Sequence, residues 1–195
     1  MRYLGESKKV IIVGIPGVGK STLVSKIVEI LEQKKKSVKV VSFGTVMFEE
    51  AEKRGVKDRD ELRKLPMESQ QKLQRMAGEA ISNLNENVVL IDTHAFISTP
   101  AGFYPGLPDY VLKIIKPSNF ISVFAKPEEI YNRRMTDKTR HRDIISLAGI
   151  KKELDVQDAM LSSCSVLSGS PLKPILNREG KVEEAAYAVI ESIGL

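Results

Sequence analysis

The chain has 195 residues, of which 42% are hydrophobic and 28% are charged, and its formal net charge is +5 at pH 7. No apolar run approaches the roughly 20 residues of a membrane span, and MRYLGESKKV at the start lacks the apolar core of a secretory signal. The single cysteine, Cys164, cannot form an intrachain disulfide, and no Cys/His cluster can hold structural zinc. We therefore expect one cytoplasmic domain that binds no membrane, and its positive charge favours an anionic ligand.

Five short runs rich in β-branched residues are predicted to be strands. They are residues 9–13 (KVIIV), 38–43 (VKVVSF), 88–92 (VVLID), 120–125 (FISVFA) and 173–177 (KPILN). Apolar residues at helical spacing follow in three segments between and after them. A first helix begins near Lys20, a last one covers about 182–193, and a second carries Leu73, Met76, Ala77, Ala80, Ile81 and Leu84 on its apolar face. The alternation predicts an α/β fold with helices on both faces of a five-stranded parallel sheet.

Two intervals between these strands are longer than a simple crossover requires. Residues 44–87 hold a polar block besides a helix, and residues 126–172 hold an arginine-rich block. Excursions that follow the carboxyl ends of strands lie where such folds bind ligands. We interpret both as substrate-handling inserts in one domain over 1–195, at about 44–75 and about 134–146. A decorated surface without a role is the alternative.

The most specific motif lies between the first predicted strand and the first predicted helix. Gly14–Ser21 has the pattern G-x-x-x-x-G-K-[ST] of a P-loop. In this pattern backbone N–H groups surround phosphate, Lys20 reaches the β- and γ-phosphates, and the hydroxyl of Ser21 binds Mg²⁺. The motif predicts a nucleotide phosphate site, but it identifies neither the nucleotide nor the reaction.

Asp92 ends the third predicted strand. A carboxylate there can hold Mg²⁺ opposite Ser21, but an Asp at the end of a strand is also a common turn or helix-capping residue. The two histidines, His94 and His141, have no partner at the spacing of a metal site or a catalytic triad. We interpret His94 as a polar loop residue near the substrate and not as a base.

Arginines gather in NRRMTDKTRHRD, which covers residues 132–143. A solvated basic helix or an RNA contact is one interpretation of such a charged stretch. The alternative is a closing loop that brings Arg140 and Arg142 to the transferring phosphoryl group, where phosphoryl transfer needs positive charge.

A second basic stretch, DRDELRKL, places Arg59 and Arg63 four residues apart, on one side of any helix there. This spacing suits a clamp for a phosphate group. Asp60 and Lys64 have the same spacing and make a plain surface ion pair the alternative.

With these elements in place, the chain resembles the archaeal type of adenylate kinase. The matching segments are GIPGVGKST, DRDELRKL, IDTHAFISTPAGFYPGLP, TRHRD and KPILN, which together span nearly the whole chain. The IDTHAFISTPAGFYPGLP segment is the specific one, because the P-loop alone indicates only a nucleotide. The resemblance implies a nucleoside monophosphate kinase of the P-loop three-layer fold, with a monophosphate-binding insert and a short lid. It also implies the reaction ATP + AMP ⇌ 2 ADP with Mg²⁺, and a homotrimer.

The resemblance also implies roles for individual residues. The lid arginines, Arg140 and Arg142, close on the transferring phosphate. The metal candidates stay Ser21, from the P-loop pattern, and Asp92, from the end of the third strand. The candidates for AMP, in the insert after Gly44 and the loop after Asp92, are Arg59, Arg63, Thr93 and His94. The ATP-binding residues are Gly14, Ile15, Pro16, Gly17, Val18, Gly19, Lys20, Ser21 and Thr22, with Arg133 near the ATP base.

Two departures from the broader adenylate kinases are visible. Those enzymes commonly carry D-G-[FY]-P-R after the third strand, whereas this chain has DTHAF. An arginine from elsewhere must therefore meet the AMP phosphate, and Arg59 or Arg63 is the candidate. The cysteine-bearing zinc lid of some relatives is missing, in keeping with the single cysteine.

Two other functions stay open at the level of sequence. Another small P-loop kinase, acting on a different nucleoside monophosphate or a small hydroxylated metabolite, would carry the same loop. An RNA- or ribosome-associated ATPase is the alternative from a different class, and the basic charge permits it. The aromatic content of 6%, without Trp, argues against a platform that stacks single-stranded nucleic acid.

Overall fold

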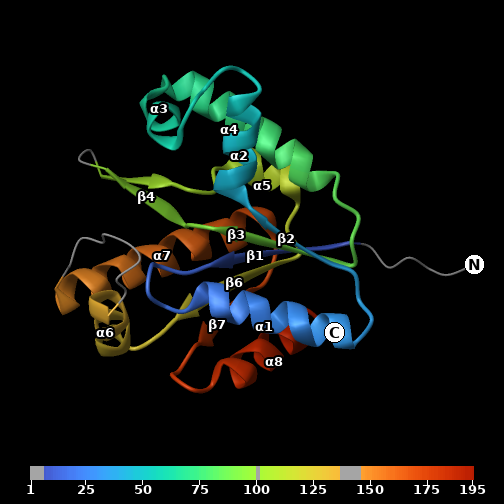
Figure 1. Cartoon of the computed structure of the whole chain (residues 1–195), viewed down its shortest axis with the longest axis vertical. Helices are drawn as coiled ribbons and strands as arrows, with labels where there is room; N and C mark the ends of the chain where they lie inside the picture. The colour runs from blue at the N-terminus through green and yellow to red at the C-terminus, as the bar shows by residue number, and fades with distance from the viewer. Residues whose placement is uncertain (1–6, 100–101, 137–145) are drawn as a thin grey trace, which may run out of the picture.

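A five-stranded parallel sheet forms the centre of the molecule (Figure 1). The computed structural model describes residues 7–99, 102–136 and 146–195. The strand order is β2-β3-β1-β6-β7, and every pairing is parallel. The strands are β1 (Lys8–Val13), β2 (Val38–Ser42), β3 (Val88–Thr93), β6 (Asn119–Phe124) and β7 (Leu172–Leu176). All five lie within one residue of their predicted bounds, and the predicted sheet is confirmed.

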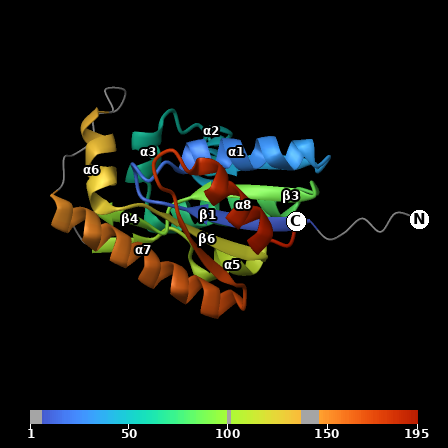
Figure 2. The same ribbon diagram turned by 90° about the horizontal axis from the view of Figure 1, so that it is seen from below.

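Helices cover both faces of the sheet (Figures 1 and 2). One face carries α1 (Lys20–Gln33) and α8 (Val182–Ser192); the other carries α4 (Met67–Ser82), α5 (Asp109–Ile115) and α7 (Leu147–Ser168). Successive residues of β1 serve the two sides in turn: Val10 and Ile12 pack with α1 and α8, whereas Ile11 and Val13 pack with α4, α5 and α7. This double cover explains why the central strands are apolar almost throughout.

The helical apolar patterns are confirmed with two exceptions, both in α4, where Leu84 lies two residues past the end of the helix at Ser82. Helix α1 begins at Lys20 and buries the face predicted from its spacing, Leu23, Val24, Ile27, Ile30 and Leu31. In α4 the predicted Ala80 is exposed, and Gly78 is buried in its place. The reason is close packing against α5, because a Cβ atom on Gly78 would lie 3.3 Å from Cγ2 of Ile114. Glycine has no apolar side chain, so the spacing of apolar residues could not identify Gly78 as a buried position.

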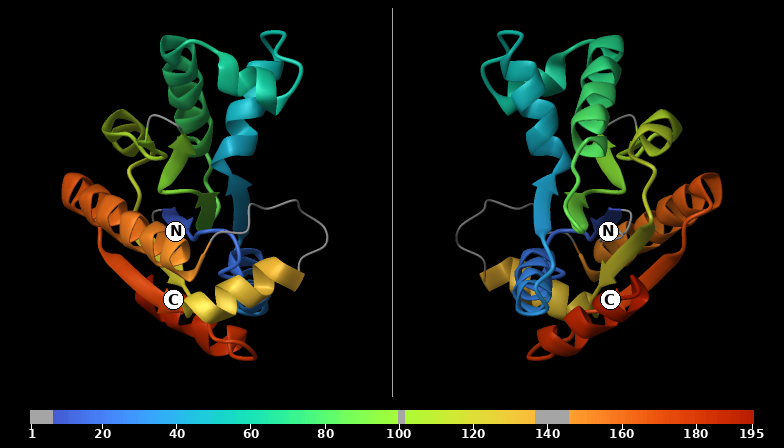
Figure 3. Two further views of the ribbon diagram at one scale, coloured as in Figure 1. Left: turned by 90° about the vertical axis from the view of Figure 1, so that its left-hand side faces the viewer. Right: turned by 90° about the vertical axis from the view of Figure 1, so that its right-hand side faces the viewer.

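Three successive helices connect β2 to β3. They are α2 (Phe43–Glu52), α3 (Arg59–Lys64) and α4. They group on the side of the sheet that ends in β2, away from α8 (Figures 1 and 3). Phe43, predicted to end a strand, instead begins α2. Asp58 caps α3, since its Oδ1 accepts hydrogen bonds from the N–H groups of Asp60 and Glu61 at 2.9 and 2.8 Å.

Two further features frame the sheet edge where the P-loop lies. An antiparallel hairpin of β4 (Phe96–Thr99) and β5 (Gly102–Pro105) follows β3. Helix α6 (Pro127–Thr136) precedes residues 137–145, so the predicted lid residues Arg140 and Arg142 lie outside the described residues. In the described part of the chain, no helix combines the length and the apolar character needed to cross a membrane.

Candidate active site

A cavity of about 360 Å³ lies over the loop between β1 and α1. Apart from Val18, every predicted residue of the P-loop lines it, and so do three residues from other elements. The lining residues are Gly14, Ile15, Pro16, Gly17, Gly19, Lys20, Ser21, Thr22, Asp92, His94 and Arg133. Val18 instead lies in the hydrophobic core, fully buried. The structure thus brings the loop together with Asp92 and His94, far along the sequence.

Two loop glycines have backbone conformations that other residues rarely adopt. The φ angles of Gly17 and Gly19 are +92° and +82°, in the left-handed region that favours glycine. Gly19 also lacks room for a side chain, because a Cβ atom there would lie 2.6 Å from Nδ2 of Asn177. These positions explain why the loop is glycine-rich.

A buried arginine fixes one peptide of the loop. The Nε of Arg134, on α6, donates to the carbonyl of Pro16 at 2.8 Å, and its Nη2 donates to Glu153 of α7 at 2.8 Å. Arg134 is only 9% exposed, and the Glu153 carboxylate compensates its charge. In a trans peptide the C=O and the following N–H point in opposite directions. The N–H of Gly17, which lines the cavity, therefore points away from Arg134.

Asn177 fixes the peptides at the end of the loop. This buried residue follows β7, and its Nδ2 donates to the carbonyls of Val18 at 2.8 Å and Gly19 at 3.4 Å. By the same trans geometry, the N–H groups of Gly19 and Lys20 point away from Asn177. Arg133 adds weaker contacts of 3.3–3.4 Å from Nη1 to the carbonyls of Val18 and Gly17. The sequence prediction missed Arg134 and Asn177, although a polar residue directly after a strand, as in KPILN, is a usable signal.

Lys20 and Asp92 form an ion pair at the floor of the cavity. The register of β1 and β3 pairs Ile12 with Asp92, which places this carboxylate beside the loop. The ammonium of Lys20 also donates to the carbonyl of Thr93 at 3.1 Å. The side chain of Lys20 is 11% exposed and that of Asp92 is 32% exposed. Asp92 lies within β3 and begins no helix, so the alternative role as a turn or cap residue does not apply.

His94 stands at the junction of two cavities. The residue keeps an exposed surface, but desolvation by the surrounding protein lowers the pKa of His94. The nearby Lys20 ammonium lowers the pKa further, and the Asp92 carboxylate acts in the opposite direction. Desolvation and a nearby cation disfavour the charged imidazolium, whereas a nearby carboxylate favours it. Together these surroundings favour the neutral form of His94 over the protonated one.

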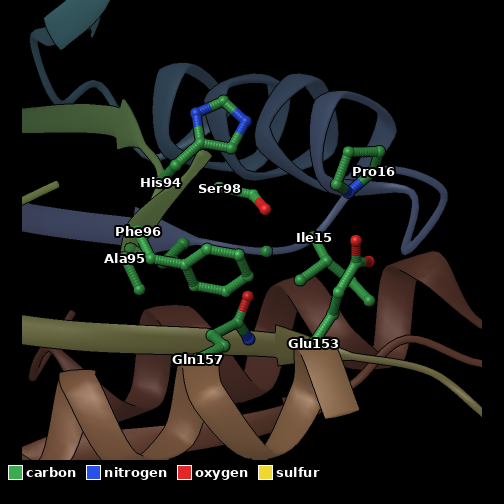
Figure 4. Close-up of a pocket in the computed structure, with 10 residues that line it drawn as sticks. Ile15, Pro16, His94, Ala95, Phe96, Ser98, Glu153 and Gln157 are labelled. Atoms are coloured by element: carbon green, nitrogen blue, oxygen red, sulfur yellow. The ribbon is translucent and has the colours of Figure 1, made fainter. Parts of the chain in front are cut away.

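The second cavity, of about 190 Å³, lies between the start of the P-loop, the residues after β3 and helix α7 (Figure 4). It shares Gly14, Ile15, Pro16 and His94 with the first cavity. Its other walls are Val13, Ala95, Phe96, Ser98, Glu153 and Gln157. The two cavities are therefore neighbours that share one stretch of the loop.

Arg59 lies elsewhere in the structure. Its Nη2 donates to Oγ1 of Thr45 at 2.9 Å, and its guanidinium carbon is 5.6 Å from the centre of the Phe48 ring. These contacts keep it on the insert, and it lines neither of the two cavities. Arg63 belongs to α3, and its side chain is outside the described part of the structure.

A glycine-rich loop that opens a helix beside a parallel sheet defines a P-loop nucleotide-binding protein. The profile of a family described as AAA domain matches residues 13–151. An adenylate kinase of Methanocaldococcus jannaschii is 40% identical over 188 residues, which cover 95% of this chain and 98% of that protein. An adenylate kinase of Thermoplasma acidophilum is also 40% identical, over 186 residues, with coverage of 95% and 98%. The chain belongs to this domain family and to the adenylate kinases.

Solved structures support the same fold. A shikimate kinase from Bacteroides thetaiotaomicron superposes with a TM-score of 0.57 and covers 96% of this chain and 99% of its own. Its sequence identity is 18%, so the likeness concerns the fold alone.

Proposed function

We propose that this adenylate kinase transfers the γ-phosphoryl group of ATP to AMP and releases two molecules of ADP. The observation that carries the proposal is the cavity over the P-loop. There the N–H groups of Gly17, Gly19 and Lys20 are oriented by side chains behind the loop, and the Lys20 ammonium and the Ser21 hydroxyl line the same space. Such oriented donors suit the phosphates of a nucleotide.

In this proposal the chemistry needs no covalent enzyme intermediate. An oxygen of the AMP phosphate forms a bond to the γ-phosphorus, the bond from that phosphorus to the bridging oxygen breaks, and its electron pair stays on ADP. Residues 14–22 hold the ATP phosphates, and Lys20 spans the donor and the transferred group. The ammonium carries three donors, of which two already meet Asp92 and Thr93. Catalysis is then positioning and neutralisation of charge.

The residues present fit Mg²⁺. Ser21 and Asp92 line one cavity and offer oxygen ligands, which this ion prefers. Among the residues that the structure describes, no group of three or more His, Cys, Asp and Glu side chains gathers. A cation held by one hydroxyl and one carboxylate, with phosphates and water completing its shell, matches the way Mg²⁺ binds with nucleotides. When bound, the ion neutralises the phosphate charge that develops during transfer.

The proposed acceptor site lies between the α2–α4 insert and the residues after Asp92. Thr93 and His94 are already at the P-loop, whereas Arg59 is on the insert and bonded to Thr45. A role for Arg59 or Arg63 on the AMP phosphate therefore requires the insert to approach the loop when AMP binds. Arg140 and Arg142 are proposed to supply charge to the transferring group, and Arg133 to lie near the ATP base.

A panel of acceptors tests this proposal. We expect rapid ADP formation from Mg·ATP with AMP and rates lower by at least about tenfold with CMP, UMP, GMP and shikimate. A preference for shikimate, or for a nucleoside monophosphate other than AMP, would mean that AMP is not the acceptor. Hydrolysis faster than transfer, together with a salt-sensitive affinity for RNA, would support the ATPase alternative.

The assembly and location of the protein are further parts of the proposal. The homotrimer rests on the resemblance to archaeal adenylate kinases, and sedimentation equilibrium should give three times the chain mass of 21.7 kDa. A cytoplasmic location suits a kinase that uses ATP and AMP and a chain with one cysteine. The single domain with two functional inserts is tested by the activity of variants in each insert.

A further inference from the structure

The second cavity contains a buried polar group whose orientation is fixed (Figure 4). Gln157, on α7, is only 1% exposed. Its Nε2 lies 3.0 Å from Oγ of Ser122 and 3.3 Å from the carbonyl of Val123, both on β6. A backbone carbonyl only accepts hydrogen bonds, so the atom that faces it is the nitrogen of the amide.

A second contact confirms this direction. The hydroxyl of Ser122 donates to Oδ1 of Asp158 at 2.8 Å, and a carboxylate only accepts. Since the hydroxyl hydrogen is used on Asp158, the Ser122 oxygen accepts from Gln157. The chain of donors therefore runs from Gln157 through Ser122 to Asp158. Exchange of the amide oxygen and nitrogen of Gln157 would break two contacts at once.

The amide oxygen is left facing the cavity. Oε1 of Gln157 is buried and has no hydrogen-bond partner among the residues that the structure describes. Figure 4 shows it turned toward the space under Phe96, while the nitrogen turns toward β6. A buried acceptor without a partner is unfavourable, and in this position it is satisfied by a ligand that brings a donor.

The surroundings restrict the chemistry of that ligand. Glu153 and Gln157 both line the cavity, where the Glu153 carboxylate is already paired with Arg134 and the amide oxygen of Gln157 offers a phosphate no donor. Ile15, Ala95 and Phe96 supply apolar walls. The volume of about 190 Å³ is below the roughly 300 Å³ at which pockets for whole small molecules begin. The cavity therefore suits one uncharged part of a nucleotide that carries an N–H or O–H donor.

We propose that Gln157 is a specificity-determining residue of the acceptor site, with Oε1 accepting a hydrogen bond from the uncharged part of the acceptor nucleotide. The position of the cavity next to Gly14, Ile15 and Pro16 places this group beside the phosphoryl-transfer site. The donor is the amine of the base or a ribose hydroxyl. The inference rests on the proposed function, since it assigns a subsite for the same acceptor.

The test compares AMP with three analogues that lack the base amine, the ribose 2′-hydroxyl or the 3′-hydroxyl. In the wild-type protein we expect one of the three to lose about tenfold in kcat/KM and in binding measured by calorimetry, as an unpaired buried acceptor implies. In Gln157→Met that discrimination should fall to within about twofold of unity, while KM for ATP stays unchanged. Gln33→Met, at an exposed glutamine of α1, is the matched control.

Two outcomes would overturn the inference. Equal binding of AMP and all three analogues by the wild type would mean that Oε1 meets only water. An equal loss for all ligands in Gln157→Met would give the residue a structural role alone. If Gln157→Met does not fold, Gln157→Asn, whose shorter side chain withdraws the amide oxygen from the cavity, replaces it in the same comparison. Phosphorylation of AMP itself tests the proposed function separately, because that reaction can be present whether or not the analogues differ.

Discussion

Lys20 is the residue where the fold and the proposed chemistry meet. It is the first residue of α1, it pairs with Asp92 of β3, and it donates to the carbonyl of Thr93. A triphosphate in the cavity adds acceptors around the same ammonium, so Asp92 and the phosphates share one cation. Lys20 can therefore contact both Asp92, near the carboxyl end of β3, and the phosphoryl group that is transferred.

Replacement of Lys20 by Met should remove activity and leave the fold in place. We expect ADP formation from ATP and AMP to fall by at least about a thousandfold, because charge neutralisation carries much of phosphoryl transfer. The melting temperature should change little, since the Asp92 side chain keeps 32% exposure to water. Coupled assay of ADP and thermal unfolding check the two parts. Near-normal turnover in Lys20→Met would refute the proposed role.

Asn177 should control ATP binding without touching the nucleotide. In Asn177→Asp an acceptor faces the carbonyls of Val18 and Gly19 in place of a donor. We expect KM for ATP to rise by about tenfold as the loop peptides lose their orientation, in line with the loss of a buried hydrogen bond. Steady-state kinetics check this, with Asn85→Asp at an exposed loop position as the control. An unchanged KM would show that the loop holds its shape alone.

His94 should make the protein less stable toward acid. Because the folded protein lowers the pKa of His94 below its ordinary 6.5, the unfolded chain takes up the proton at a higher pH. Stability is therefore lost as the pH falls below the unfolded value toward the folded one. From about pH 7.5 to about pH 5.5, the melting temperature should fall less in His94→Asn than in the wild type. Parallel curves for the two proteins would contradict this account.

At the scale of whole elements, the β4–β5 hairpin is tied closely to the site. The N–H of Gly106 donates to the carbonyl of Ala95 at 2.8 Å, and a Cβ atom on Gly106 would lie 2.0 Å from the carbonyl oxygen of His94. The backbone at Gly106 packs directly against the backbone at His94. The end of the hairpin therefore helps to position His94, which lines both cavities. Only glycine allows this approach.

Gly106→Ala should therefore disturb the hairpin and the site together. We expect a loss of about 2 kcal/mol or more in the free energy of unfolding, because an atom is forced into packed backbone. Activity should fall with it through displacement of His94. Denaturant titration and the ADP assay provide the measurements. Gly44→Ala is the control, since a Cβ atom there has only the guanidinium of Arg59 within 4 Å, at 3.8 Å; equal stabilities of the two variants would argue against the steric account.

The same elements show what the sequence could predict. The strands and α1 are encoded locally, by β-branched runs and by a repeat of apolar residues, so the sheet was predicted correctly. The hairpin was not predicted, because FISTPAGFYPGLP reads as turns and its pairing depends on the approach of Gly106. In the site, Lys20 and Ser21 were found from a contiguous motif. Arg134 and Asn177 act through contacts with residues more than 100 positions away, which no local pattern contains.

Viewed as a whole, the molecule combines a net charge of +5 with two neighbouring cavities at one edge of the sheet. Both cavities are built from segments that meet only in the folded chain, namely the P-loop, the residues after β3, and α6 or α7. Ligands that occupy them therefore bind the native state and not the unfolded chain. Binding must then raise the stability of the entire domain.

This linkage gives a measurable expectation. A non-hydrolysable ATP analogue at a hundredfold excess over its Kd should add about 2.7 kcal/mol of stability. For a domain of this size that corresponds to a rise in melting temperature of about 5–10 °C. Differential scanning calorimetry with and without the analogue measures it, and Lys20→Met should show a smaller rise. No shift at saturating analogue would mean that the cavity over the P-loop is not the ATP site.

The central position of β1 also decides when this protein can fold during synthesis. The strand emerges early, yet its two neighbours in the sheet are β3, whose pairing starts at Lys8 with Val88, and β6, which pairs Val10 with Asn119. The apolar residues of β1 therefore stay unpaired during synthesis until β3 and β6 have been made. Long-range pairing of this kind folds slowly and leaves hydrophobic surface unprotected meanwhile. The P-loop therefore gains the support of Asn177 only after that residue, 159 positions beyond Val18, has been synthesised.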